Sequence, residues 1–274
     1  MIQFKKMVKK YLQIFRISFA QEFAYKVNFI MWRVRNVIQV LIAYYLWSTV
    51  FADPGTSVFG YDQAKILTYI FGIMLIRALV FSARSVDVPQ EISEGSLTNY
   101  LVRPMNYFRY WFTRDASSKA LNLTFSIAEF GILAAIFRPP LFFQSNASYL
   151  LAFFLSLIIA NYLIFIIRFI VTSVTFWVPE LAWGGQFLFM VVITEILSGS
   201  IFPLDIFPAA WQTLFYYTPF PYLIFFPLQV YLGKIPFPEV LGGISISLLW
   251  SLGLSYVLKV IWHKGLRVYD AVGR

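Results

Sequence analysis

Residues 149–171 read YLLAFFLSLIIANYLIFIIRFIV, and Arg168 is the one charged residue in this run. A helix needs about 20 predominantly apolar residues to cross the hydrocarbon core of a bilayer, and the run has that length. No water reaches the backbone inside a bilayer, so a helix, which pairs its own N–H and C=O groups, is the expected structure. The run therefore predicts a transmembrane helix.

The composition of the whole chain agrees with this helix. Hydrophobic residues make up 59% of the 274 residues and charged residues 13%, whereas soluble domains carry about 25% charged residues. The mean hydropathy is +0.71, and the alternating ten-residue segments of membrane β-barrels are not evident. We therefore predict an all-α, polytopic membrane protein that forms a single domain over residues 1–274.

Apolar segments of this kind predict six transmembrane helices, the fifth of them short. They span residues 27–51, 66–82, 120–137, 149–171, 186–197 and 240–262. Before them, residues 4–23 place apolar side chains three and four residues apart with lysines between them, which is typical of an amphipathic helix on the inner membrane surface. An ordinary solvated helix is the alternative for this segment.

The distribution of Lys and Arg sets the orientation. Most of these residues lie in the N-terminal segment, between residues 84 and 119, and in the C-terminal tail. The protein is therefore predicted to span the inner (plasma) membrane with both termini in the cytoplasm. The net charge of +9 indicates loops that face anionic lipid, so we expect no nucleic-acid partner. The absence of cysteine excludes disulfides and thiolate metal sites.

Proline gathers in residues 198–238, which are nevertheless too apolar for a watery loop. The prolines of this segment are Pro203, Pro208, Pro219, Pro221, Pro227, Pro236 and Pro238. Irregular backbone is tolerated at membrane depth only where protein or a cavity covers it, which favours short re-entrant helices that enter the outer leaflet and return. A kinked seventh span is the alternative, but it would place the two termini on opposite sides of the membrane.

A polar stretch, EISEGSLTNYLVRP at residues 91–104, lies between two of the most apolar regions. Asp87 precedes Pro89 and Gln90, an order that predicts a helix start capped by the Asp87 side chain. Gly95 weakens this helix, and Ser96 can cap a second turn, which predicts a short helix in two pieces. On the orientation above, the whole segment at 85–104 lies in the cytoplasm.

The second half of the polar stretch has a small apolar face. Leu97, Tyr100 and Leu101 share one side of a helix, which Arg103 and Pro104 end. A helix with such a face and polar flanks, held below the bilayer by two spans, has the geometry to fill a groove on another protein.

The features occur in a definite order along nearly the whole chain. A basic interfacial helix and two spans precede the pattern G-x-L-x-x-x-L-x-x-P, which comprises Gly95, Leu97, Leu101 and Pro104. Two more spans, a short fifth, the stretch SG-x-x-x-P-L-x-x-x-P from Ser198 to Pro208 and a sixth span follow. This order resembles the membrane subunit of an ABC transporter of the type-2 export permease class. The tail GLRVYDAVG is similar to that of small six-span permeases in the class.

The resemblance implies a site and partners. In that family the loop after the second span is a coupling helix that docks into a separate ATPase, and re-entrant helices close the outer mouth. The matching residues are Gly95, Leu97, Leu101 and Pro104 for coupling, and Gly199, Pro203 and Pro208 for the re-entrant segment. We add Glu91, Glu94 and Arg103 from chemistry alone, as charges able to pair with the ATPase surface, with a solvated face as the alternative.

Four charged residues are candidates for intramembrane charges: Arg77, Glu129, Arg168 and Glu195. Arg33, Arg35 and Lys259 also fall within the predicted spans, but near their cytoplasmic ends. A charge at mid-membrane costs roughly 2.5–3.5 kcal/mol on insertion scales, which favours pairing inside the bundle. A rise of about 1.5 Å per residue puts Arg77 and Glu129 at similar depths, whereas Arg168 and Glu195 lie far apart. We therefore expect an Arg77–Glu129 pair, or else separate positions that line a cargo path or face a sister subunit.

The chain has no G-x-x-x-x-G-K-[ST] motif, so ATP is expected to be bound by a partner and the chain needs no cofactor of its own. A second copy, or a similar sister permease, would place a cargo path at the interface between the two. A secondary transporter is one alternative, although internal repeats are not evident. An integral membrane enzyme is another, but His263 stands alone as a candidate catalyst.

Overall fold

The structure is a computed structural model that describes residues 2–22, 26–53, 55 and 57–269, and no β-strand forms within these ranges. The α-helices are α1 (Ile2–Glu22), α2 (Lys26–Val50), α3 (Gln63–Val80), α4 (Val88–Ser93), α5 (Thr98–Leu101), α6 (Tyr107–Phe137), α7 (Ala147–Ser173), α8 (Leu181–Gln186), α9 (Thr194–Leu197), α10 (Ala209–Tyr216), α11 (Phe225–Tyr231) and α12 (Phe237–Val268). A π-helix at Phe187–Ile193 joins α8 to α9. The predicted all-α class is confirmed.

Among the described residues, four helices are long and apolar enough to cross a membrane. They are α3, α6, α7 with the turn that follows it, and α12. The helix α2 has 25 residues, but it is not among these four. Arg33, Arg35, Asn36 and Gln39 interrupt its apolar sequence. The fifth predicted span is a shorter apolar helix, Leu181–Leu197. All six predicted segments are therefore helical, and the count of six spans stays a prediction.

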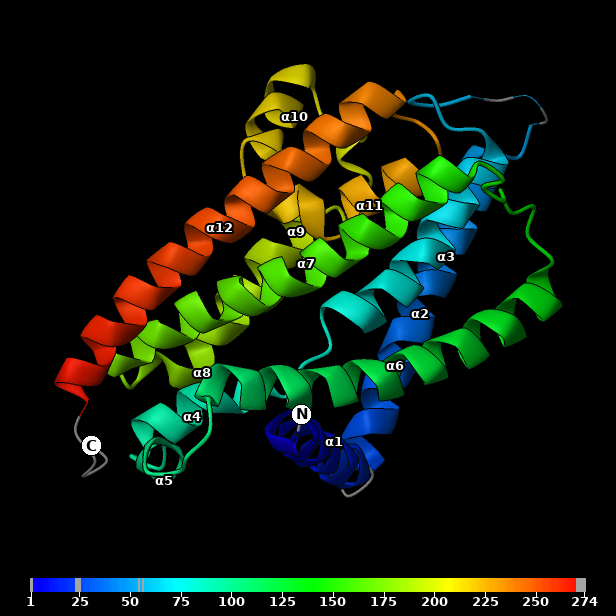
Figure 1. The fold of residues 1–274 in the computed structure, drawn as a ribbon. Helices are drawn as coiled ribbons and strands as arrows, with labels where there is room; N and C mark the ends of the chain where they lie inside the picture. Colours follow the sequence, from blue (N-terminus) through cyan, green and yellow to red (C-terminus); the bar gives the residue numbers. More distant parts are fainter. Residues whose placement is uncertain (1, 23–25, 54, 56, 270–274) are drawn as a thin grey trace.

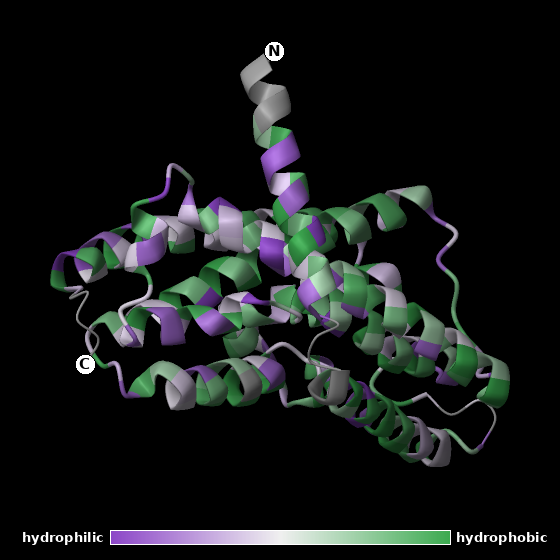
Figure 2. Ribbon diagram, turned by 90° about the horizontal axis from the view of Figure 1, so that it is seen from below, coloured by the Kyte–Doolittle hydropathy of each residue, from purple (hydrophilic) through white to green (hydrophobic). Residues whose placement is uncertain are grey.

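The long helices form one bundle. Figure 1 shows α7 and α12 side by side along the length of the molecule, with α3 packed between α2, α6 and α7. Hydrophobic residues predominate along the long helices, while hydrophilic ones alternate with them on α1 (Figure 2). The helix α1 crosses below α6 (Figure 1) and contacts it, and the Lys10 ammonium donates to the carbonyl of Pro104 at 3.2 Å. The predicted N-terminal helix is thus formed, and it packs on the bundle.

Within the part of the chain that the structure describes, two hydrophobic clusters hold the helices together. The larger one fills the space between α3, α7 and α11. The smaller one, here called the lower cluster, lies where α4 meets the ends of α7 and α12. Its buried members are Val88, Ile92, Leu97, Tyr107, Trp111, Phe165, Ile166, Phe169, Phe176, Leu258 and Trp262. The lower cluster fixes the polar stretch to the bundle.

Residues 198–238 form short helices in place of one long span. The helices α10 and α11 have eight and seven residues, and neither approaches the roughly 20 residues of a span. Pro203 and Pro208 each directly precede a helical turn, where the missing N–H of proline does little harm. The segment therefore has the broken form predicted for it, with α11 buried in the larger cluster.

The crossing of α12 over α11 depends on a residue without a side chain. A β-carbon at Gly243 would overlap the ring of Phe226, whereas one at the neighbouring Gly242 would meet no atom within 4 Å. We expect Gly243→Ala to destabilise the protein by roughly 1–3 kcal/mol through overpacking. Gly242→Ala should be neutral or slightly stabilising because alanine favours helix. Thermal unfolding midpoints in detergent compare the two, and equal midpoints would contradict the close packing of α12 on α11.

Candidate functional site

The polar stretch lies at one end of the bundle, together with α1 and the last turns of α12 (Figure 1). The helix α4 begins at Val88, as predicted, but the Asp87 side chain makes no capping hydrogen bond. A 3-10 turn, Ser85–Asp87, runs directly into α4, so Asp87 is already helical and its side chain does not accept from the N–H groups of the first turn of α4. The predicted Asp87 cap is therefore wrong, although the predicted start is right.

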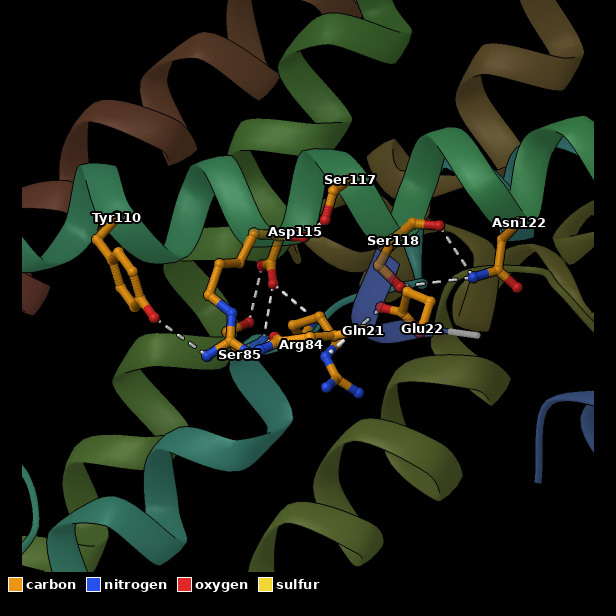
Figure 3. Close-up of polar contacts among 10 residues, drawn as sticks. Gln21, Glu22, Arg84, Ser85, Tyr110, Asp115, Ser117, Ser118 and Asn122 are labelled. Atoms are coloured by element: carbon orange, nitrogen blue, oxygen red, sulfur yellow. Dashed lines mark hydrogen bonds and ion pairs between the residues drawn. The ribbon is translucent and has the colours of Figure 1, made fainter. Parts of the chain in front are cut away.

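Asp115 on α6 supplies the missing cap (Figure 3). Its carboxylate accepts from the backbone N–H groups of Arg84 and Ser85, both at 2.7 Å, and from the Ser85 hydroxyl at 2.8 Å. Arg84 also forms an ion pair with Glu22 of α1 at 3.5 Å. A carboxylate on a helical start is favourable because free N–H groups point at it. One acid of α6 thus joins the polar stretch to the bundle and, through Arg84, to α1.

Cations satisfy the other side of this junction, at the end of α3. The Lys119 ammonium donates to the carbonyls of Leu79 and Val80, at 2.9 and 2.7 Å. The Arg168 guanidinium donates to the carbonyl of Phe81 at 3.1 Å. Helix ends leave carbonyls without partners, and positive groups there also suit the helix dipole. Arg168, predicted as an intramembrane charge, is therefore buried in a structural contact.

Gly95 ends α4 in the left-handed conformation, with φ of 78°. Its N–H donates to the carbonyl of Ile92 at 3.2 Å, and the N–H of Leu97 donates to the carbonyl of Glu91 at 3.0 Å. Residues with a β-carbon are strained at this φ, so glycine suits the position. This turn, and not a Ser96 cap, separates α4 from α5.

The structure corrects the predicted apolar docking face. Leu97 is 0% exposed and belongs to the lower cluster, so it faces the chain's own core. Tyr100 is half-buried against Tyr107 and Tyr110, with ring centroids 5.6 and 5.2 Å away. The turn at Gly95 directs the start of α5 inward. The spacing of Leu97, Tyr100 and Leu101 along the sequence could not show this direction. Leu101 stays exposed, as predicted.

The outer side of the stretch consists of other residues. Val102 is 77% exposed, and Arg103 and Pro104 are also exposed. The Arg103 guanidinium lies over the Tyr100 ring at 5.3 Å. Sequence reasoning missed Val102 because it lies outside the i, i+3, i+4 pattern. We call the exposed residues Leu101–Pro104 the docking edge.

The two glutamates of the stretch differ in their surroundings. Glu91 is half-buried and accepts a hydrogen bond from the Tyr107 hydroxyl at 2.8 Å. Burial raises the pKa of Glu91, and the Tyr107 hydrogen bond opposes that rise. Glu94 is exposed and accepts from the Gln90 amide at 2.7 Å. Glu91 thus has an internal partner, while Glu94 is open to solvent beside the docking edge.

The charges inside the spans pair differently from the prediction. The Arg77 guanidinium lies 2.6 Å from Glu195, and Glu129 pairs with Arg33, whose Nε donates to it at 2.6 Å. The expected Arg77–Glu129 pair is therefore wrong. The depth count assumed that the fifth helix ends at the outer surface, but Gly199, just beyond it, accepts from the Tyr69 hydroxyl within the core at 2.7 Å. This helix ends beside α3, so Glu195 reaches Arg77.

A polar cluster fixes the re-entrant segment at the opposite end of the molecule. The Lys234 ammonium lies 2.7 Å from Asp205 and 3.1 Å from the centroid of the Tyr61 ring. Gln229 donates to Asp205 at 3.1 Å and to the Tyr61 hydroxyl. Burial lowers the pKa of Lys234, and Asp205 opposes the shift. Sequence reasoning missed this cluster because its members lie far apart along the chain.

Of the predicted re-entrant residues, Gly199 and Pro203 are buried, whereas Pro208 is exposed. Gly199 has φ of 76°, and a β-carbon there would come within 2.9 Å of Phe225. An open groove of about 960 Å³ lies nearby, between α10, α11 and α12. Its walls are mostly aromatic and glycine residues, with Tyr216, Tyr217, Tyr222, Phe226, Glu239, Gly242, Gly243 and Trp250 among them.

Comparison with known proteins identifies one matching family. The family described as ABC-2 family transporter protein matches residues 37–273. This match covers the polar stretch with the docking edge, and the re-entrant segment. It also covers the Arg77–Glu195 pair and Glu129, whereas Arg33, the partner of Glu129, lies before its first residue. No curated protein sequence matches the chain.

The revised ion pairs can be tested by double-mutant cycles on thermal stability. Arg33→Met and Glu129→Gln should each lower stability, and the double variant should lose less than the sum, with a coupling of roughly 0.5–3 kcal/mol. Arg77→Met with Glu129→Gln is the matched control, and those losses should add because the residues do not touch. Additive losses for the first pair would show that Arg33 and Glu129 are not in contact.

Proposed function

Since the chain belongs to the ABC-2 transporter family and is the membrane permease component of an ABC transporter, we propose that it serves an exporter and docks a separate ATPase through residues 87–104. The observation that carries this proposal is the docking edge. It projects an apolar residue, Val102, from a segment whose other side is fastened to the lower cluster. A rigid support with an exposed apolar tip suits a segment that passes force between subunits.

The charges around the docking edge indicate the nature of the partner surface. Lys9, Lys10, Arg103 and Arg109 are exposed at this end of the chain, and Glu94 is the exposed acid of the stretch. Opposite charges steer association and fix its register more than they add affinity. We therefore propose that the ATPase offers an apolar pocket for Val102 with acidic groups around it.

The remaining parts of the proposal concern assembly and orientation. The ATPase partner binds ATP, because the chain has no phosphate-binding loop motif. A second copy, or a similar sister permease, forms the cargo path together with this chain. The protein spans the inner (plasma) membrane with both termini and the docking edge in the cytoplasm, which agrees with the distribution of Lys and Arg. The polar cluster of Asp205 and Lys234 then faces outward.

Val102→Asp tests the docking edge. A charge in an apolar pocket removes the contact and should weaken ATPase binding roughly tenfold or more, as loss of an interface hot spot does. The variant should insert into the membrane and keep the thermal unfolding midpoint of the wild type, because Val102 is exposed and contacts few other residues. Co-purification of the ATPase and permease-stimulated ATP hydrolysis measure the effect.

Val268→Asp is the matched control, because Val268 is an exposed valine, at 53%, near the end of α12. It should leave ATPase binding unchanged. Wild-type hydrolysis and binding in Val102→Asp would exclude the docking edge as the coupling contact. Leu97→Asp is unsuitable for this test, because a buried charge in the lower cluster would unfold the segment itself.

Cysteine labelling tests the orientation, since the chain has no cysteine of its own. Ser57, Ser145 and Asn99 are all exposed. In intact cells, Ser57→Cys and Ser145→Cys should react with an impermeant maleimide, while Asn99→Cys should react only after lysis. The reverse pattern would invert the proposed orientation and exclude a cytoplasmic docking edge.

A further inference from the structure

Arg33 and Arg35 lie two residues apart on α2 but in different surroundings. Arg33 is buried and donates to Glu129, to the Ser126 hydroxyl and to the carbonyl of Asn122. The Arg35 side chain is 37% exposed, and its guanidinium lies 4.0 Å from Glu195. Within the described part of the chain, Arg35 makes no hydrogen bond. Its five N–H donors therefore remain available.

The charges near Arg35 do not balance. Arg35 and Arg77 share the single carboxylate of Glu195, and Arg77 holds it at the shorter distance of 2.6 Å. Glu129, the carboxylate of α6, is already paired with Arg33. Among the described residues this group of two arginines and one glutamate thus carries one excess positive charge. A membrane-embedded charge is costly without a partner of opposite sign, so the site favours an anion.

The surface around Arg35 is apolar. Trp32, Ile38 and Ile42 are three and seven residues from Arg35 on α2, which puts all of them on one exposed side of the helix. The guanidinium lies over the Trp32 ring at 4.8 Å from its centroid. On the helix that carries Glu195, Ile196 is also exposed. One open cation is therefore bordered by hydrocarbon-compatible side chains.

We propose that Arg35, with Arg77 beside it, binds the phosphate headgroup of an anionic amphiphile whose hydrocarbon chain lies along the exposed face of α2. Guanidinium matches phosphate because its planar fork donates two parallel hydrogen bonds, and Trp32 holds the fork in place. A resident bilayer lipid and an exported lipid-like cargo share this chemistry. The site is separate from the docking edge and does not depend on the proposed coupling.

Native mass spectrometry of the full chain in detergent tests the site, with dioleoyl phosphatidylglycerol as the probe. The wild type should bind this lipid more tightly than dioleoyl phosphatidylcholine, which has the same chains and no net charge. Arg35→Gln should weaken phosphatidylglycerol binding roughly tenfold, the loss expected for a charge-assisted hydrogen bond. Equal affinity in wild type and Arg35→Gln, or no preference between the two lipids, would overturn the proposal.

Arg138→Gln is the control, because Arg138 is an exposed arginine at the end of α6, outside both this site and the docking edge. It should keep the wild-type affinity for phosphatidylglycerol. A loss equal to that of Arg35→Gln would show that any surface arginine contributes as much, and would overturn the proposed site. Should Arg35→Gln fail to purify in folded form, Arg35→Lys decides: it keeps the charge without the fork and should bind severalfold more weakly. Unchanged affinity in Arg35→Lys excludes the bidentate contact.

A second measurement distinguishes a resident bilayer lipid from an exported cargo. In liposomes that contain the chain and its co-purified ATPase, a cargo should leave the site during ATP hydrolysis, whereas a resident lipid should remain. Either result requires that binding depends on Arg35. Because binding is measured on the chain without an ATPase, the site and the proposed coupling can fail separately.

Discussion

The contact of Lys119 with the last carbonyls of α3 is the interaction on which the lower half of the structure depends. Where α3 ends, the carbonyls of Leu79 and Val80 have no partner within the helix. Transfer of an unpaired polar group from water into hydrocarbon costs roughly several kcal/mol. A cation from α6 satisfies both carbonyls. The chain can therefore leave the span at a fixed point and direction.

Everything below that point builds on the same helix. Four residues before Lys119 on α6, Asp115 caps the turn that starts the polar stretch, and Tyr107 and Trp111 lie in the lower cluster against which α4 packs. The helix α6 thus positions both ends of the polar stretch, because α5 leads back into it. The docking edge is held by several independent contacts while its tip stays open.

Local pattern was enough to predict much of this molecule. The apolar runs indicated the long helices, Pro203 and Pro208 marked the broken segment, and Gly95 marked the turn within the polar stretch. What failed depended on tertiary packing. Leu97 was expected to point outward because its spacing with Leu101 suggested one face, but the turn at Gly95 directs it into the lower cluster. The partner of Arg77 was missed because counting residues from presumed membrane surfaces says nothing of where a helix ends in space. Asp115 and Lys119 gave no signal as single residues, since most of their partners are backbone groups in the segment between α3 and α4 and at the end of α3.

The uninterrupted length of α12 has a mechanical consequence. Its lower end contributes Leu258 and Trp262 to the lower cluster, while Gly242 and Gly243 near its other end line the open groove. At about 1.5 Å per residue, the 32 residues of α12 make a rod of about 48 Å. A tilt of about 5° at the lower end would move the far end by about 4 Å, by the geometry of a rigid rod of that length. A displacement of that size would change the width of the groove, because α12 forms one of its walls.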